Sequence, residues 1–196
     1  SHVVVGRGFR FGKGAAGTVE DLREAGLVVH EVEQVTHHAE RVSSTRIREA
    51  LELGNLALAN ELLTRAHRYQ GKIVSGLKRG RDLGFPTANL DPQFPSAAPA
   101  DGIYAGYLLE LDSLDQEVKR WPAAISVGTN PTFDDVPERV VEAHALYETD
   151  LDLYGLTMAV DFVERLRPML AFDSSAELVA AMTTDVRETA RILGIS

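Results

Sequence analysis

The chain has 196 residues, of which 44% are hydrophobic and 25% charged, and it contains no cysteine. This length fits one or two domains, and the apolar fraction is that of a folded globular protein. The lack of cysteine excludes a disulfide framework, a thiolate nucleophile and cysteine-ligated metal centres. With 20 basic and 29 acidic residues, the net charge of −9 disfavours general binding to nucleic acid. No apolar run reaches the roughly 20 residues that span a bilayer, so we expect a cytoplasmic protein whose partners are small molecules.

The first third of the chain predicts an α/β segment. The expected elements are a strand over residues 3–5, a helix capped by Thr18 that runs to Ala25, a strand over residues 27–32, a helix that begins at Ser43-Ser44-Thr45 and stops at Gly54, and a helix capped by Asn55 that runs to about Arg65. A single βαβ unit needs about 30 residues, so this segment is too short for a complete parallel sheet. The chain also opens with Ser1-His2 and no methionine, as a tag remnant or a chain that begins inside a longer protein would.

The rest of the chain predicts a β domain, and we place the boundary between residues 1–66 and residues 67–196. Strands are expected over residues 69–74, 103–111, 123–127, 139–147 and 157–163, with glycine and proline clusters between them. Short strands at this spacing favour a closed barrel or a sandwich. A final helix is expected after Ser174, its N-cap, with Glu177 completing a capping box. Leu178, Met182 and Val186 form its apolar stripe.

The segment from Gly71 to Asn89 is basic in an acidic chain, because Lys72, Lys78, Arg79 and Arg81 stand against Asp82 alone. Its glycines at 76, 80 and 84 recur every fourth residue. Glycine lets the backbone approach a ligand closely, and exposed N–H groups beside basic side chains suit phosphate. It is not a Walker A loop, because the G-x-x-x-x-G-K-[ST] pattern is absent. The alternative interpretation is a solvated basic hairpin loop.

Pro86-Thr87-Ala88-Asn89 follows this loop. In an extended segment, Thr87 and Asn89 point to the same side. A hydroxyl and an amide carbonyl are hard oxygen ligands that suit Mg²⁺ and its phosphates. The alternative is a turn in which the asparagine side chain bonds its own backbone.

Six ordered motifs from about Tyr69 to Leu193 resemble those of the riboflavin kinase family. Residues 76–89 carry G-x-x-x-G-R-x-L-G-F-P-T-A-N, which looks like the signature of that family. The others are G-I-Y-A-G at 102–106, I-S-V-G-T-N-P-T-F at 125–133, V-E-A-H at 141–144, D-L-Y-G at 152–155, and R-L-R-P at 165–168 with F-D-S at 172–174. Two departures are Ala145-Leu146-Tyr147, where two aliphatics and an aspartate are common, and Met169, where an acid is frequent.

The resemblance implies a mainly β fold, a six-stranded antiparallel barrel with a C-terminal helix, that phosphorylates the 5′-hydroxyl of riboflavin with ATP and Mg²⁺. It also implies that Glu142, in V-E-A-H, is the catalytic base. The residues agree, because Val140, Glu142, His144 and Leu146 share one face of a strand. A carboxylate among apolar neighbours is paired or functional, and it can accept a hydroxyl proton. The alternative is a glutamate that faces solvent on the outside of the barrel. His144 fits a structural role, or a role that supports a neighbouring site residue, better than a catalytic one.

The resemblance implies further site residues. Those on the nucleotide side are Gly76, Lys78, Gly84, Thr87, Asn89 and Asn130, with Thr87 and Asn89 also as Mg²⁺ ligands. Those on the flavin side are Arg167, Phe172 and Asp173. A non-catalytic module that only binds flavin or nucleotide is the competing hypothesis, and self-association is left open.

The N-terminal segment resembles part of an FMN adenylyltransferase, a Rossmann-like nucleotidyltransferase fused to the kinase in many bacteria. Residues 4–12 are similar to its V-G-x-D-F-x-F-G motif, with Gly8 in place of the aspartate. Ser43, Ser44, Thr45 and Arg46 belong to S-S-T-x-I-R, which holds a nucleotide triphosphate in that module. The H-x-G-H signature of the module does not occur in this chain. We therefore expect residues 1–66 to be its C-terminal remnant, with kinase chemistry retained and adenylyl transfer absent; the remnant could equally be an interaction surface or an unstable leftover.

Overall fold

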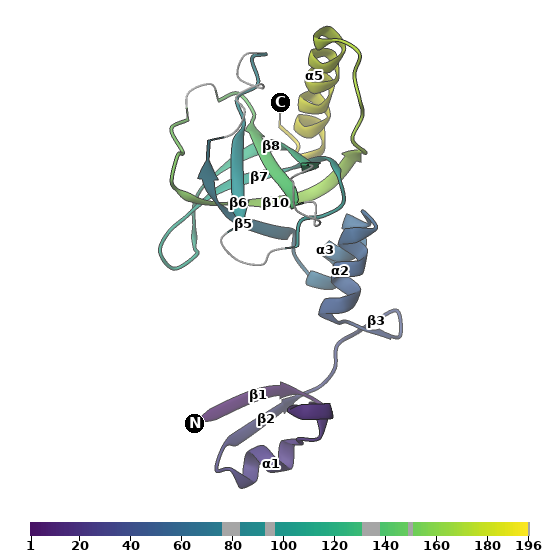
Figure 1. The fold of residues 1–196 in the computed structure, drawn as a ribbon, viewed down its shortest axis with the longest axis vertical. Helices are drawn as coiled ribbons and strands as arrows, with labels where there is room; N and C mark the ends of the chain where they lie inside the picture. Colours follow the sequence, from purple (N-terminus) through teal and green to yellow (C-terminus); the bar gives the residue numbers. More distant parts are fainter. Residues whose placement is uncertain (76–82, 93–96, 131–137, 149–150, 196) are drawn as a thin grey trace. The chain divides into compact units, whose positions relative to one another are not determined.

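The computed structural model describes residues 1–75, 83–92, 97–130, 138–148 and 151–195, and Figure 1 shows its course. The chain forms two compact units, Ser1–Ser44 and Thr45–Ser196. None of the described helices combines the length and the hydropathy needed to span a bilayer.

The first unit is small and built around two parallel strands. Its elements are β1 (His2–Gly6), η1 (Lys13–Ala15), α1 (Val19–Glu24), β2 (Val28–Val32), β3 (Thr36–His37) and β4 (Glu40–Arg41). β1 pairs in parallel with β2, and β3 pairs with β4 in an antiparallel hairpin. The Thr18 hydroxyl accepts the backbone N–H of Asp21, and the Asp21 carboxylate accepts the N–H of Thr18 at 2.6 Å. These findings confirm both predicted strands and the predicted N-cap.

The second unit contains a closed antiparallel barrel of six strands (Figure 1). The strands are β5 (His67–Val74), β6 (Ala88–Pro92), β7 (Gly102–Leu111), β8 (Glu117–Asn130), β9 (Glu138–Ala145) and β10 (Thr157–Arg167). Their order around the barrel is β10-β5-β6-β9-β8-β7. The barrel implied by the resemblance is thus confirmed. The alternation of apolar residues had predicted five of these strands, with β8 and β10 shorter than they are, and had not separated β6 from the preceding loop.

The interior of the barrel is filled by side chains from every strand. Tyr104 and Leu108 of β7 belong to this buried cluster. Because side chains alternate along a strand, the residues that alternate with them, such as Ile103 and Tyr107, lie on the outer wall. Gly106 faces inward, where an added Cβ would lie 2.8 Å from the side chain of Ile125 and would collide with the carbonyl oxygen of Asp161 on β10. β7 and β10 therefore approach each other as closely as they do because residue 106 is glycine.

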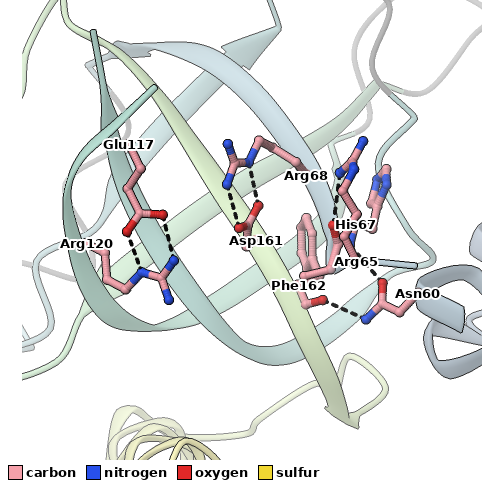
Figure 2. A network of polar contacts seen from close by, with 9 residues as sticks. Asn60, Arg65, His67, Arg68, Glu117, Arg120, Asp161 and Phe162 are labelled. Carbon is pink, nitrogen blue, oxygen red and sulfur yellow. Dashed lines mark hydrogen bonds and ion pairs between the residues drawn. The ribbon is translucent and has the colours of Figure 1, made fainter. Parts of the chain in front are cut away.

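Two helices that precede the barrel pack into the same core. They are α2 (Ser44–Glu52) and α3 (Leu56–Leu63), joined at Gly54 and Asn55. The α2–α3 hairpin contributes Ala50, Leu51, Leu56 and Ala59 to the interior cluster. The Asn60 amide donates to the carbonyl of Phe162 on β10 at 3.0 Å and accepts the N–H of His67 at 2.8 Å (Figure 2). The compact unit therefore begins well before residue 67, where the sequence pattern changes.

The outer wall over β5 and β10 carries an ion pair between these neighbouring strands. Arg68 and Asp161 lie opposite each other in the ladder and form two hydrogen bonds, at 2.7 and 2.8 Å (Figure 2). The bonded Asp161 raises the pKa of Arg68 above its ordinary value. Beside them, Arg120 bonds both oxygens of Glu117 and lowers the pKa of that carboxyl. The charges of these four side chains are thus paired with one another on the outer wall.

The last helix, α5 (Ser175–Ile192), packs against β7, β8 and β10. The Ser174 hydroxyl accepts the N–H of Glu177 at 3.2 Å, which confirms the predicted N-cap. The Glu177 carboxylate accepts the N–H of Asp173, one residue earlier than a standard capping box would place the donor. This helix covers part of the outer wall and leaves a cavity beneath it.

Candidate active site

One row of residues crosses the outer wall from strand to strand. On neighbouring strands, Asn89 stands opposite Glu142, and Glu142 stands opposite Ser126. Ser126 in turn stands opposite Ile103, and Ile103 opposite Arg167. Directly opposed residues have their Cβ atoms about 5 Å apart. The barrel register therefore joins a residue predicted for the nucleotide side, the predicted base and a residue predicted for the flavin side in one line.

A cavity of about 390 Å³ lies along this row, between the barrel wall and α5. Its lining comes from the segment before β6, from β6–β10, from the residues after β10 and from α5: Leu83, Phe85, Thr87, Asn89, Ile103, Ala124, Ile125, Ser126, Glu142, His144, Arg167, Met169, Leu170, Phe172, Leu178, Met182, Asp185 and Val186. This volume, and a mainly apolar lining with a few polar groups, are typical of small-molecule sites.

Glu142 is half-buried on β9 and lines the cavity. Its neighbours along the strand, Val141 and Ala143, point into the barrel, so Glu142 lies on the outer wall. The hydroxyl of Thr87 donates to Glu142 Oε2 at 3.1 Å. A carboxylate has room for about four hydrogen bonds, so a second hydroxyl can still be accepted. Glu142 thus lies on the outside of the barrel, as the alternative of a solvent-facing glutamate would have it. It is nevertheless enclosed in a cavity and hydrogen-bonded to Thr87.

Thr87 and Asn89 also line the cavity, on either side of the first residue of β6. Both lie beside Glu142: Thr87 donates a hydrogen bond to its carboxylate, and Asn89 stands opposite it in the β6–β9 ladder. A hydroxyl, an amide carbonyl and a carboxylate gathered at one end of a cavity are an all-oxygen donor set. Such a set fits Mg²⁺, which prefers hard oxygen ligands and usually keeps several waters and phosphate oxygens.

The opposite end of the row is built around Arg167. Its guanidinium forms two hydrogen bonds, at 2.9 and 2.7 Å, to the carboxylate of Asp185, a buried residue of α5. Phe172 also lines the cavity, with its ring centre 5.8 Å from the Arg167 guanidinium carbon. The third predicted flavin residue, Asp173, is exposed just before α5 and is not among the described lining residues.

The remaining predicted site residues fall into three groups. Gly84 has a φ of 87° and lies between two lining residues, Leu83 and Phe85. Gly76 and Lys78 lie outside the described residues, and Asn130 is described only as the last residue of β8. The predicted triphosphate residues begin α2: Ser43 precedes it, and Ser44, Thr45 and Arg46 form its first turn. These four residues do not line the described cavity.

The sequence motifs did not indicate Asp185 or Ser126, and they favoured a structural or supporting role for His144. Asp185 interrupts the apolar stripe of α5 one residue before Val186, and a carboxylate on such a stripe is a signal for a buried partner. Ser126 lies in the I-S-V-G-T-N-P-T-F motif, but its place opposite Glu142 depends on the strand register.

Comparison with known proteins identifies two families, which match different parts of the chain. The riboflavin kinase family matches residues 63–193, and the FAD synthetase family matches residues 1–46. The bifunctional riboflavin kinase/FMN adenylyltransferase of Escherichia coli K12 is 33% identical over 99% of this chain, and that of Bacillus subtilis is 31% identical over 97%. The chain spans 61% and 60% of the lengths of these relatives.

Among solved structures, a Streptococcus pneumoniae chain described as a macrolide-efflux protein superimposes with a TM-score of 0.75 and 35% identity. The match covers 94% of this chain and 58% of that one, and its description applies to that protein alone. The barrel, the ordered motifs and the family match over most of the chain lead to one conclusion: this chain belongs to the riboflavin kinase family.

Proposed function

We propose that this chain transfers the γ-phosphate of ATP to the 5′-hydroxyl of riboflavin, producing FMN and ADP. The observation that carries the proposal is Glu142, hydrogen-bonded by Thr87 in a 390 Å³ cavity beneath α5. A bond forms between the 5′-oxygen and the γ-phosphorus, and the bond from that phosphorus to the β–γ bridging oxygen breaks. Glu142 accepts the proton that leaves the hydroxyl, which is the positioned-base role expected in phosphoryl transfer.

The nucleotide would bind at the Thr87 end of the row. Thr87 and Asn89 offer the oxygen donors that would hold Mg²⁺ beside the ATP phosphates. When bound, the ion supplies positive charge that offsets the charge developing on the phosphates. The two side chains would hold the phosphates beside Glu142, because Thr87 donates a hydrogen bond to its carboxylate and Asn89 stands opposite it in the β6–β9 ladder.

The flavin ring would bind at the α5 end. This end is lined by apolar side chains of Met169, Leu178, Met182 and Val186, together with the ring of Phe172. A planar aromatic ring system buries apolar surface there, which is the main source of affinity for such ligands. Arg167 is already paired with Asp185, so it would orient the ring by hydrogen bonds without presenting an unpaired charge.

The test is conversion of riboflavin with ATP and Mg²⁺, followed by chromatography. Glu142→Gln keeps the shape of the side chain and its place beside Thr87 but removes the proton acceptor, so we expect kcat to fall by about 10²–10⁴-fold. The Kd of riboflavin, measured by quenching of flavin fluorescence, should stay within about threefold of the wild-type value, since glutamine presents nearly the same contact surface as glutamate. Glu164→Gln, an exposed glutamate of β10 outside the cavity, is the matched control and should leave kcat unchanged.

Three outcomes would count against the proposal. Near-normal turnover of Glu142→Gln would remove Glu142 as the base. Absence of FMN with the wild-type chain would contradict the kinase assignment. Tight flavin and ADP binding without turnover would favour the competing hypothesis of a non-catalytic binding module.

The relatives are named for two activities, and residues 1–46 match the FAD synthetase family. We propose that a protein of their full length also adenylylates FMN to FAD, and that this chain, which lacks H-x-G-H, stops at FMN. Incubation with FMN, ATP and Mg²⁺ should then produce no FAD, and FAD formation would refute this point. We also infer that the reaction takes place in the cytoplasm, where ATP is supplied.

A further inference from the structure

His144 lies on β9 two residues after Glu142 and lines the same cavity, yet the reaction proposed above gives it no part. Its Nδ1 lies 2.9 Å from the carbonyl oxygen of Pro86. A carbonyl oxygen can only accept a hydrogen bond, so Nδ1 carries a proton and donates it. In the neutral ring, Nε2 then has the lone pair. The imidazole also meets the ring of Phe85 edge-on, with ring centres 5.4 Å apart.

The segment that His144 contacts is not held by strand pairing. The described β6–β9 ladder begins where Ala88 stands opposite Ala143, so Pro86 lies beyond its end. Proline has no N–H with which to join a ladder. The imidazole therefore continues the contact between β6 and β9 past the point where backbone pairing begins.

The next residue is Thr87, whose hydroxyl donates to Glu142. Two successive residues of one segment are thus bonded to two alternate residues of β9, Pro86 to His144 and Thr87 to Glu142. If Pro86 were released, the hydroxyl bond to Glu142 would be the one bond left to Thr87 among those described between this segment and β9, because the described β6–β9 ladder begins after it, at Ala88.

We propose that His144 is a positioning residue: by donating to the Pro86 carbonyl, it fixes the Phe85–Thr87 segment and aims Thr87 at Glu142 and at the phosphate end of the cavity. The kinetic consequence rests on the proposed kinase function, whereas the hydrogen bond itself does not. Small displacements of positioning groups cost large factors in rate, since reacting groups must be held within a fraction of an ångström.

Two variants separate the hydrogen bond from the ring. His144→Phe keeps an aromatic ring against Phe85 but has no donor, and we expect kcat to fall at least about tenfold. The KM for riboflavin should change less than about twofold, because flavin binds at the other end of the row. His144→Asn keeps an N–H donor near the place of Nδ1 and should retain at least about a third of the wild-type kcat.

His67→Phe is the matched control. His67 also donates to a backbone carbonyl, that of Ala97 at 2.7 Å, but it lies outside the cavity. Its replacement removes the same kind of bond, and kcat should stay within about twofold of the wild type. Melting temperatures of all three variants, measured in parallel, separate loss of positioning from loss of folded protein.

Equal kcat values for the wild type and His144→Phe would overturn the proposal, and so would an equal loss in His144→Phe and His144→Asn, which would point to the ring instead of the donor. The second readout is independent of turnover: the ¹⁵N shifts of the His144 ring at about pH 8, assigned with His144→Phe, should report a proton on Nδ1. A proton on Nε2 would overturn the proposal. A wild-type chain that forms no FMN would refute the kinase function, and the ring tautomer would then decide the His144 bond alone.

Discussion

The α2–α3 hairpin can be tested as part of the barrel core with a single pair of substitutions. Leu51, on α2, is 1% exposed within the interior cluster, whereas Leu53, two residues later, is 82% exposed. Replacing a fully buried leucine by alanine costs the transfer free energy of the lost methyl groups and the cavity they leave, about 3–5 kcal/mol. Replacing an exposed leucine costs within about 0.5 kcal/mol. The two variants should therefore differ by about 2.5 kcal/mol or more.

Urea unfolding provides the measurement, because the chain contains one tryptophan and that residue reports on the barrel. Trp121 lies on β8 and belongs to the interior cluster, with 5% of its surface exposed. Its fluorescence should follow the unfolding of Leu51→Ala at a clearly lower urea midpoint than that of Leu53→Ala, with a similar slope. A loss of this size is a large part of the free energy of unfolding of an ordinary domain, about 5–15 kcal/mol.

Equal midpoints for the two variants would refute the reasoning, since they would mean that the hairpin does not share the core of the barrel. The same argument predicts that residues 45–196 unfold with the midpoint of the whole chain in the tryptophan signal. Residues 67–196 alone should unfold at a much lower urea concentration, because they lack every core side chain of the hairpin.

Two further predictions concern the barrel. Gly106→Ala should lower the free energy of unfolding by about 1–3 kcal/mol, because its Cβ would collide with the carbonyl of Asp161 and lie 2.8 Å from Ile125. Gly128→Ala is the control, because its Cβ would meet its nearest neighbour at 3.6 Å. Equal urea midpoints for the two variants would contradict the close approach of β7 and β10. Burial lowers the pKa of His67, so the unfolded chain takes up a proton below about pH 6.5 before the folded chain does, and stability is lost as the pH falls through this range. His67→Phe should lose less stability than the wild type between about pH 8 and pH 5.5, and parallel pH profiles would show that His67 makes no such contribution.

Local signals in the sequence were sufficient for the helices. The N-caps at Thr18, Asn55 and Ser174 each bond a backbone N–H three residues later, so the interaction that starts the helix lies within one turn of sequence. Local signals were not sufficient for β6, the one barrel strand that the sequence pattern did not predict. β6 has only five residues and ends in proline, and it forms because β5 and β9 pair with it from both sides. Such pairing comes from distant residues, which no local pattern contains.

The candidate site likewise contains residues that local motifs predict and contacts that depend on distant pairing. Thr87, Asn89 and Glu142 stand in motifs that can be found in the sequence, but their alignment depends on the register of β6 with β9. The extension of that line to Arg167 needs three more strand pairings around the barrel. The partner of Arg167, Asp185, comes from a helix, so no strand pattern could connect the two.

Along β9, alternate residues face different parts of the molecule. Val141 and Ala143 pack into the barrel, while Glu142 and His144 face the cavity. On this strand, a change at Glu142 or His144 can reshape the cavity without removing a core side chain, and a change at Val141 or Ala143 leaves the cavity-facing side chains unaltered. Ligand preference and folding stability can therefore be altered at different residues of one strand, even though these residues alternate along it. A barrel that held its substrate inside would not have this freedom, since each new ligand shape would require a new core.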